Sequence, residues 1–274
     1  MKTLPSAARL LAAGLLFLAL AAPGSAKPPK AAKKASAQAE KGAPDVEQGS
    51  AQAPGLIEPD TQLIDIPTAG ILDVGGFATQ TRFFSQGGVL QWLNFGVIHR
   101  VNIGASLNVE KLIGTDSPVQ LTRPELQLKF RFYDGDRIIP AFAVGYDGQG
   151  YLYNRPDKRY NQRQRGMYLT GTQEIGLPGL QAHAGMNISD FDSNAIFGFL
   201  GLSLDLRDRA ALIAEWDNIQ NYVDSRVNLG LKVYLAPNAY VSFAVRGVGQ
   251  GGVYSDGVSR GAERIFQFKY TGNF

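Results

Sequence analysis

Residues 101–111, VNIGASLNVEK, alternate apolar and polar side chains. Up to position 110, every odd-numbered residue is apolar and every even-numbered residue is Asn, Gly, Ser or Glu. Successive side chains of a strand point to opposite faces, so a period of two predicts a strand with one apolar and one polar face. Helical spacing would mix the two sets. Residues 126–132 and 227–233 repeat the pattern.

Similar segments of about ten residues follow one another from about residue 63 onward, separated by Gly, Asp, Asn and Pro. We count twelve, at residues 71–84, 89–98, 101–111, 124–133, 138–147, 166–176, 180–190, 195–206, 210–218, 225–236, 239–249 and 262–274. The connections after even-numbered segments are short, and several of the others are long. An even strand count with short turns on one side and long loops on the other is typical of outer-membrane barrels. The sequence therefore predicts an all-β fold, a single 12-stranded antiparallel up-and-down transmembrane β-barrel.

A soluble β-sandwich shows the same alternation, so strand length and charge placement have to separate the two folds. About ten residues is the length that a tilted strand needs to cross a bilayer. Charged residues also occupy mid-strand positions on the polar face, where a barrel would turn them inward, away from lipid. These predicted lumen charges are Glu110, Lys129, Arg131, Glu174, Asp205, Glu215, Asp217, Arg226, Lys232, Arg246 and Lys269.

The last predicted strand places Phe266, Phe268, Tyr270 and Phe274 on one face. This pattern resembles the C-terminal signal that the barrel assembly machinery recognises, and an ordinary apolar edge strand is the alternative. Because an open sheet edge is excluded in lipid, this strand must pair with the first. The first strand is the least regular, since Gly75 and Gly76 interrupt it, so we expect a bulge there or a second half outside the membrane.

The N-terminal part divides the chain into three regions. Residues 1–26 have the basic start, short apolar core and small-residue end of a secretory signal peptide, with an uncleaved helical anchor as the alternative. Residues 27–62 are rich in Ala, Lys, Pro, Gln and Ser, which predicts a disordered periplasmic linker whose lysines either stay solvated or touch peptidoglycan or anionic lipid. Residues 63–274 form the barrel. This order predicts a protein of the bacterial outer membrane with its linker and C-terminus in the periplasm.

Composition excludes several classes of function. The chain has no cysteine, which rules out thiol catalysis and cysteine-ligated metals. A net charge of +3 argues against nucleic acid as a partner.

Few residues suggest chemistry, and we predict no catalytic residue, cofactor or metal. His99 falls in a predicted periplasmic turn. His183 shares the polar face of its strand with Ser189, but residues six apart on a strand lie roughly 20 Å apart, too far for a Ser–His pair. Asp190, Asp192 and Asn194 could bind calcium weakly, but the rest of an EF-hand loop is missing, and an acidic, solvated loop tip is the favoured interpretation. The glycine-rich residues 247–252 precede no helix, which excludes a dinucleotide site.

The long loop at residues 147–165 is rich in tyrosine and arginine. Such a loop could bind phosphates or sugars of lipopolysaccharide at the cell surface. Loop residues with tyrosines at the membrane interface are the alternative. The candidate ligand residues are Tyr151, Tyr153, Arg155, Arg159 and Tyr160.

Several short motifs resemble the YjbH-type outer-membrane barrel family, which is linked to exopolysaccharide export in Gram-negative bacteria. They are IPTA at 66–69, PELQLK at 124–129, IPAFAVGYD at 139–147, AEWD at 214–217 and NLGL at 228–231. The resemblance covers roughly residues 63–250 and implies a polysaccharide partner. Typical members are much larger, and this chain has the length of one barrel.

We therefore expect a non-enzymatic outer-membrane barrel for envelope structure or polysaccharide export, surrounded by lipid and lipopolysaccharide and inserted by the barrel assembly machinery. A small, weakly selective pore is the first alternative and an outer-membrane hydrolase the second. Twelve strands lie between the eight that side chains fill and the sixteen that leave a channel, so a narrow or plugged lumen is expected.

Overall fold

The computed structural model describes residues 60–115, 118–189, 195–207, 209–219, 225–248, 252–253 and 259–274. The predicted signal peptide at 1–26 and the predicted linker as far as residue 59 lie outside the described residues. In the described ranges, no helix is long and apolar enough to cross a membrane.

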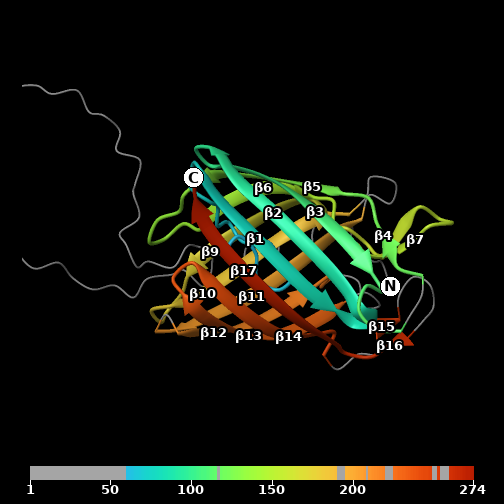
Figure 1. Ribbon diagram of the computed structural model, residues 1–274. Helices are drawn as coiled ribbons and strands as arrows, with labels where there is room; N and C mark the ends of the chain where they lie inside the picture. Colours follow the sequence, from blue (N-terminus) through green and yellow to red (C-terminus); the bar gives the residue numbers. More distant parts are fainter. Residues whose placement is uncertain are drawn as a thin grey trace, which may run out of the picture. The chain divides into compact units, whose positions relative to one another are not determined.

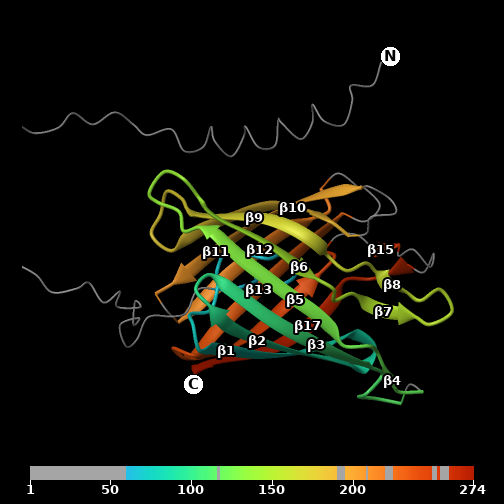
Figure 2. The same ribbon diagram turned by 90° about the horizontal axis from the view of Figure 1, so that it is seen from above.

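Twelve antiparallel strands form a closed barrel (Figures 1 and 2). They are β1 (Gly76–Phe84), β2 (Gly88–Ile98), β3 (Val101–Glu110), β5 (Glu125–Tyr133), β6 (Ala141–Asp147), β9 (Gly166–Glu174), β10 (Leu180–Ile188), β11 (Ile196–Leu206), β12 (Ala210–Asp217), β13 (Arg226–Ala236), β14 (Ala239–Arg246) and β17 (Glu263–Asn273). Each pairs with its neighbour along this series, and β1 pairs with both β2 and β17. The predicted fold class and strand number are confirmed.

Short elements extend the barrel on its long-loop side. The turn η1 (Ser85–Gly87) joins β1 to β2, and β4 (Gln120–Leu121) pairs with the end of β3. Two hairpins project beyond the wall: β7 (Tyr151–Asn154) with β8 (Arg159–Gln162), and β15 (Gly252–Val253) with β16 (Ser259–Arg260). The other end of the barrel carries the short turns, which we call the short-turn end.

The first strand differs from the expectation. It begins at Gly76, five residues later than predicted, and its pairings with β2 and β17 contain no register shift. The expected bulge is therefore absent from β1. The irregular residues before Gly76 belong to no wall strand, so they do not disturb the sheet.

Apolar side chains cover the outer face of the barrel. Phe130, Leu229 and Phe268, from three different strands, each expose 37–47% of their surface. Their neighbours Lys129, Asn228 and Lys269 point inward and are buried. An apolar exterior around a polar interior, with every strand edge paired, is the architecture of an outer-membrane β-barrel.

Residues 60–75, which we call the lumen segment, fold back inside the barrel. The segment makes a tight hairpin: Gln62 and Pro67 form a β-bridge, and the Leu63 N–H donates to the Ile66 carbonyl at 3.0 Å. Figure 2 shows this part of the chain in blue within the ring of strands. Asp65 lies at the tip. Residues 63–75 were expected to belong to the barrel wall, and this interior position is the main departure from the sequence-based prediction.

Two wall glycines provide room for the hairpin. A Cβ atom on Gly201 would lie 2.3 Å from Cδ1 of Ile66, and one on Gly230 would lie 2.9 Å from Cδ1 of Ile64. Both isoleucines are buried. Their burial removes apolar surface from water inside an otherwise polar lumen, which stabilises the segment against this side of the wall.

Candidate functional site

The candidate site is the occupied lumen, and its central contact is the tip of the lumen segment. Asp65 binds two guanidinium groups: Oδ1 lies 2.8 Å from Nη1 of Arg82 on β1, and Oδ2 lies 2.6 Å from Nε of Arg246 on β14. All three side chains are buried. Arg82 also donates to the Ile64 carbonyl, and Arg246 also pairs with Glu263 at 2.5 Å. Charge pairs that are removed from water in this way hold a segment in one place only while both partners are present.

A wall carboxylate binds the backbone of the same tip. The N–H groups of Ile64, Asp65 and Ile66 all donate to Glu215 on β12, at 2.7–3.2 Å. Asn228 on β13 donates to the other oxygen of Glu215 at 2.9 Å. Successive N–H groups that converge on one anion form a backbone nest. The buried carboxyl group of Glu215 is thereby hydrogen-bonded by the lumen segment.

Lysines hold the base of the hairpin, nearer the short-turn end. Lys232 on β13 pairs with Asp60 and lies 4.3 Å from the ring centre of Tyr240. On the opposite wall, the ammonium group of Lys129 on β5 donates to the carbonyls of Thr61, Thr68 and Gly70, the last two at 3.0 and 3.2 Å. An ammonium group has three protons, so these carbonyls use its full donor capacity.

These contacts keep both acidic side chains of the hairpin ionised. Burial raises the pKa of Asp65, but the guanidinium groups of Arg246 and Arg82 lower it by more, so that it lies well below 3.8. Burial likewise raises the pKa of Asp60, and Lys232 and Lys269 outweigh that effect and lower it. Both carboxylates are therefore charged at neutral pH.

The β7–β8 hairpin covers the lumen on the long-loop side. Tyr151 is buried, accepts a hydrogen bond from Arg82, and places its ring centre 4.5 Å from the guanidinium carbon of Arg246. Tyr160 is also buried and donates to Glu125 at 2.8 Å, and the Tyr153 N–H donates to Glu110 at 2.9 Å.

The residues of the predicted ligand loop do not all lie at the exposed tip. Tyr151 and Tyr160 face the interior, because their hydroxyl groups satisfy charged groups of the wall. Tyr153 is half-buried, while Arg155 and Arg159 are exposed at the hairpin tip.

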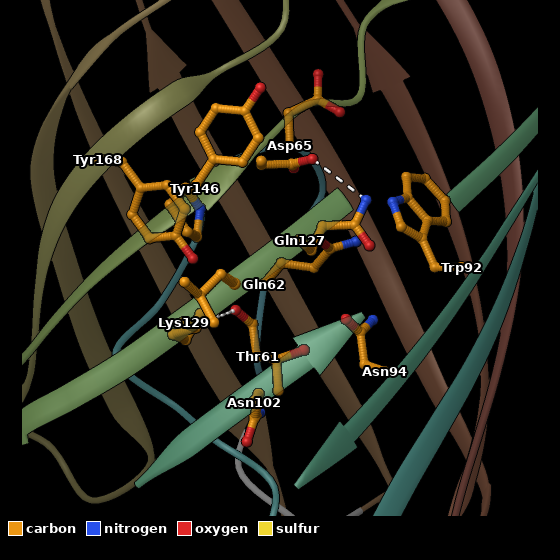
Figure 3. A pocket seen from close by; sticks show the side chains of 13 residues that line it. Thr61, Gln62, Asp65, Trp92, Asn94, Asn102, Gln127, Lys129, Tyr146 and Tyr168 are labelled. Atoms are coloured by element: carbon orange, nitrogen blue, oxygen red, sulfur yellow. Dashed lines mark hydrogen bonds between the residues drawn. The ribbon is translucent and has the colours of Figure 1, made fainter. Parts of the chain in front are cut away.

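A small polar cavity remains between the lumen segment and strands β2, β3 and β5 (Figure 3). Its volume of about 50 Å³ is room for roughly three to five water molecules. The indole N–H of Trp92 and the amide oxygens of Asn102 and Gln127 line it, and these buried atoms have no hydrogen-bond partner among the described residues. The lumen segment is therefore packed against Gly201 and Gly230 on one side and leaves a polar gap on the other.

All eleven predicted lumen charges share the inward phase of their strands. Glu110, Lys129, Glu215, Asp217, Lys232, Arg246 and Lys269 are buried. Arg226 is half-buried and pairs with Asp217 at 3.3 Å. Arg131, Glu174 and Asp205 lie near the short-turn end, where Glu174 is exposed.

His183 has partners that sequence reasoning missed. Its Nδ1 lies 3.0 Å from the Thr172 hydroxyl and its Nε2 lies 3.1 Å from that of Ser203, whereas the Ser189 considered earlier bonds to Asn187. Thr172 also accepts from the Ala69 N–H, and which ring nitrogen of His183 donates depends on the tautomer of the imidazole. The signal was available, because Thr172 is directly opposite His183 on β9 and Ser203 is two positions from the residue opposite it on β11, so all three share a face.

The remaining predicted features lie outside the lumen or outside the described residues. Phe268, Tyr270 and Phe274 are exposed, and Phe266 is half-exposed on the same outward face. Asp190, Asp192 and Asn194 are outside the described residues. Within the described part, no three His, Asp or Glu side chains gather to hold a metal ion.

Comparisons with known proteins give a likeness of architecture. No family model matches the sequence, so the resemblance to the YjbH-type family is not confirmed, and no curated protein matches either. Among solved structures the chain is similar to the KdgM porin, with 8% identity and a TM-score of 0.46 over 71% of this chain and 98% of the porin. It is also similar to the NanC porin (9%, 0.37, 72% and 99%) and to outer membrane phospholipase A from Escherichia coli (14%, 0.40, 73% and 90%). At these values the likeness is one of barrel shape alone.

Proposed function

We propose that this chain is a non-enzymatic β-barrel of the bacterial outer membrane that is closed at rest by its own lumen segment. The outward apolar side chains would face acyl chains and lipopolysaccharide, and closure of the sheet leaves none of the twelve described wall strands with an open edge in lipid. In this proposal the short-turn end faces the periplasm. The outward aromatic residues of β17 would be recognised by the barrel assembly machinery.

One observation carries the proposal: the segment inside the lumen is held by ion pairs to strands on one side of the barrel and by the ammonium group of Lys129 on the opposite wall. Asp65 joins β1 to β14, and Asp60 reaches Lys232 on β13. A loosely packed loop would not place three carboxylate–cation pairs and two buried isoleucines inside a barrel. In this proposal the lumen segment blocks the passage of solutes.

A planar-bilayer recording tests this directly. The purified protein should insert without steady current, whereas a variant that lacks residues 60–74 should give stable open channels. A wild-type protein with steady open-channel current would contradict the closed state. Both polysaccharide export and a weakly selective pore would require the lumen segment to leave.

The hydrolase alternative has one supporting observation, the His183–Ser203 contact. Against it, both residues lie inside the barrel, away from a lipid substrate. Hydrolysis of lipid or peptide by the refolded protein, lost on His183→Ala, would revive this alternative.

A further inference from the structure

The lumen segment and the wall that binds it have opposite charge. Residues 60–75 carry Asp60, Asp65 and Asp73 and contain no Lys, Arg or His. Five cations of the barrel and its loops bind the segment through its carboxylates or carbonyls, and we call them the anchor cations: Arg82, Lys129, Arg165, Lys232 and Arg246. Against these five, the hydrogen bonds of the described residues bring one wall carboxylate, Glu215, to the segment.

We propose that the anchor cations are the binding site for an extended polyanion, which takes the place of the lumen segment and opens the barrel. This inference rests on the proposed closed state, since it names the ligand that would end it. The lumen segment then acts as an internal stand-in for that ligand.

If the lumen segment left the barrel, some anchor cations would keep an anionic partner and others would lose theirs. Arg246 keeps Glu263, and Arg165 keeps Asp217 at 2.9 Å. Lys232 loses Asp60, and Lys129 loses the three carbonyls that bind it. A charge left without a partner in a protein interior is strongly unfavourable, so an open lumen attracts anions to these lysines. Glu215 retains Asn228 at 2.9 Å.

The spacing of the anchor cations indicates the shape of the ligand. Lys232 is opposite Ser242 on β14, and Arg246 is four residues further along that strand. At about 3.3 Å per residue, the two cations lie roughly 13 Å apart along the strand. A single small anion cannot reach both. A linear chain that carries phosphates or carboxylates at regular intervals can.

The test uses two linear polyanions, polyphosphate and a polyuronate oligomer, with neutral dextran of similar length as the control. In the variant that lacks residues 60–74, at least one of the two polyanions should block the open channel. The concentration that gives half-block should be at least tenfold lower for that polyanion than for dextran. Lys129→Gln combined with Lys232→Gln in this background should raise the blocking concentration at least tenfold, while Lys158→Gln at the exposed hairpin tip should not. The better blocker of the two identifies the anionic group.

The full-length protein provides the second readout, which also serves if the deletion variant does not fold. Ala69 is buried in the lumen segment, so a thiol in Ala69→Cys should react slowly with a water-soluble reagent. Either polyanion should speed this reaction at least tenfold, and dextran should not. Absence of both block and faster labelling overturns the proposed site. Steady current through the untreated wild-type barrel overturns the closed state instead, so the two failures are distinguishable.

Discussion

Replacing Asp65 by asparagine should release the lumen segment while leaving the barrel intact. The side chain lies between Arg82 and Arg246, and asparagine keeps its size but removes the charge. Loss of one partner from a buried ion pair costs about 3–5 kcal/mol. Arg246 retains Glu263, which places the expected cost at the lower end, about 3 kcal/mol. Since 1.4 kcal/mol is a factor of ten, the population with the segment displaced should rise roughly a hundredfold.

Thiol labelling measures this population, because the natural chain contains no cysteine. Ala69→Cys reports on the lumen segment, and Ala262→Cys, at an exposed position, reports on the reagent itself. Asp65→Asn should accelerate labelling at position 69 by roughly two orders of magnitude and leave position 262 unchanged. Asp73→Asn is the matched control, because Asp73 is exposed and has no ion pair among the described residues. Equal labelling rates in wild type and Asp65→Asn would refute the reasoning.

Three further perturbations address packing, lipid contact and pH. Ile66→Ala truncates a fully buried side chain and should destabilise the seated lumen segment by about 2–5 kcal/mol. Channel opening in bilayers should therefore become at least about thirtyfold more frequent. Val74→Ala, at an exposed position, should leave the opening frequency unchanged. Leu231 faces outward at mid-strand, and Leu231→Arg should lower the free energy of unfolding from lipid vesicles by about 2–4 kcal/mol. Leu235→Arg, near the turn, should lower it by about 0–1 kcal/mol. Equal costs for the two variants would argue against a bilayer around β13. Because the folded-state pKa values of Asp60 and Asp65 are lowered, their contribution is complete at neutral pH and is lost only as the pH falls through those values. In a Glu215→Gln background, which removes the titrating wall carboxyl group at the same tip, current should therefore be no greater at pH 5 than at pH 7, and an increase would contradict the assignment.

The barrel wall could be predicted from the sequence because its pattern is local. A strand with one face in lipid and one in a polar lumen must alternate at every residue, and the predicted strand at 101–111 matches Val101–Glu110 within one residue. The inward position of Lys129, Glu215 or Lys232 follows from the same period. The twelve-strand count follows because each strand has its own turn residues.

The lumen segment could not be predicted in this way, since its structure depends on partners far away in the chain. Asp65 and Arg246 are separated by 181 residues, and the three N–H groups bound to Glu215 by about 150. A short hairpin without regular alternation resembles an irregular first strand when it is read alone. The signal that was available is indirect: Gly201 and Gly230 lie at inward positions in the middle of their strands, where a missing side chain leaves room for something else.

The position of residues 60–75 inside the membrane-embedded barrel is tested most directly by a disulfide between Ile66→Cys and Gly201→Cys. A Cβ atom on Gly201 would lie 3.5 Å from Cγ1 of Ile66, which brings the two sulfur atoms within bonding reach. In lipid vesicles under mild oxidation, the pair should cross-link rapidly and nearly completely, seen as a mobility change on a denaturing gel that reverses on reduction, while Ile66→Cys with Gly261→Cys should not. A pair that stays reduced in correctly folded protein would show that the segment lies outside the lumen.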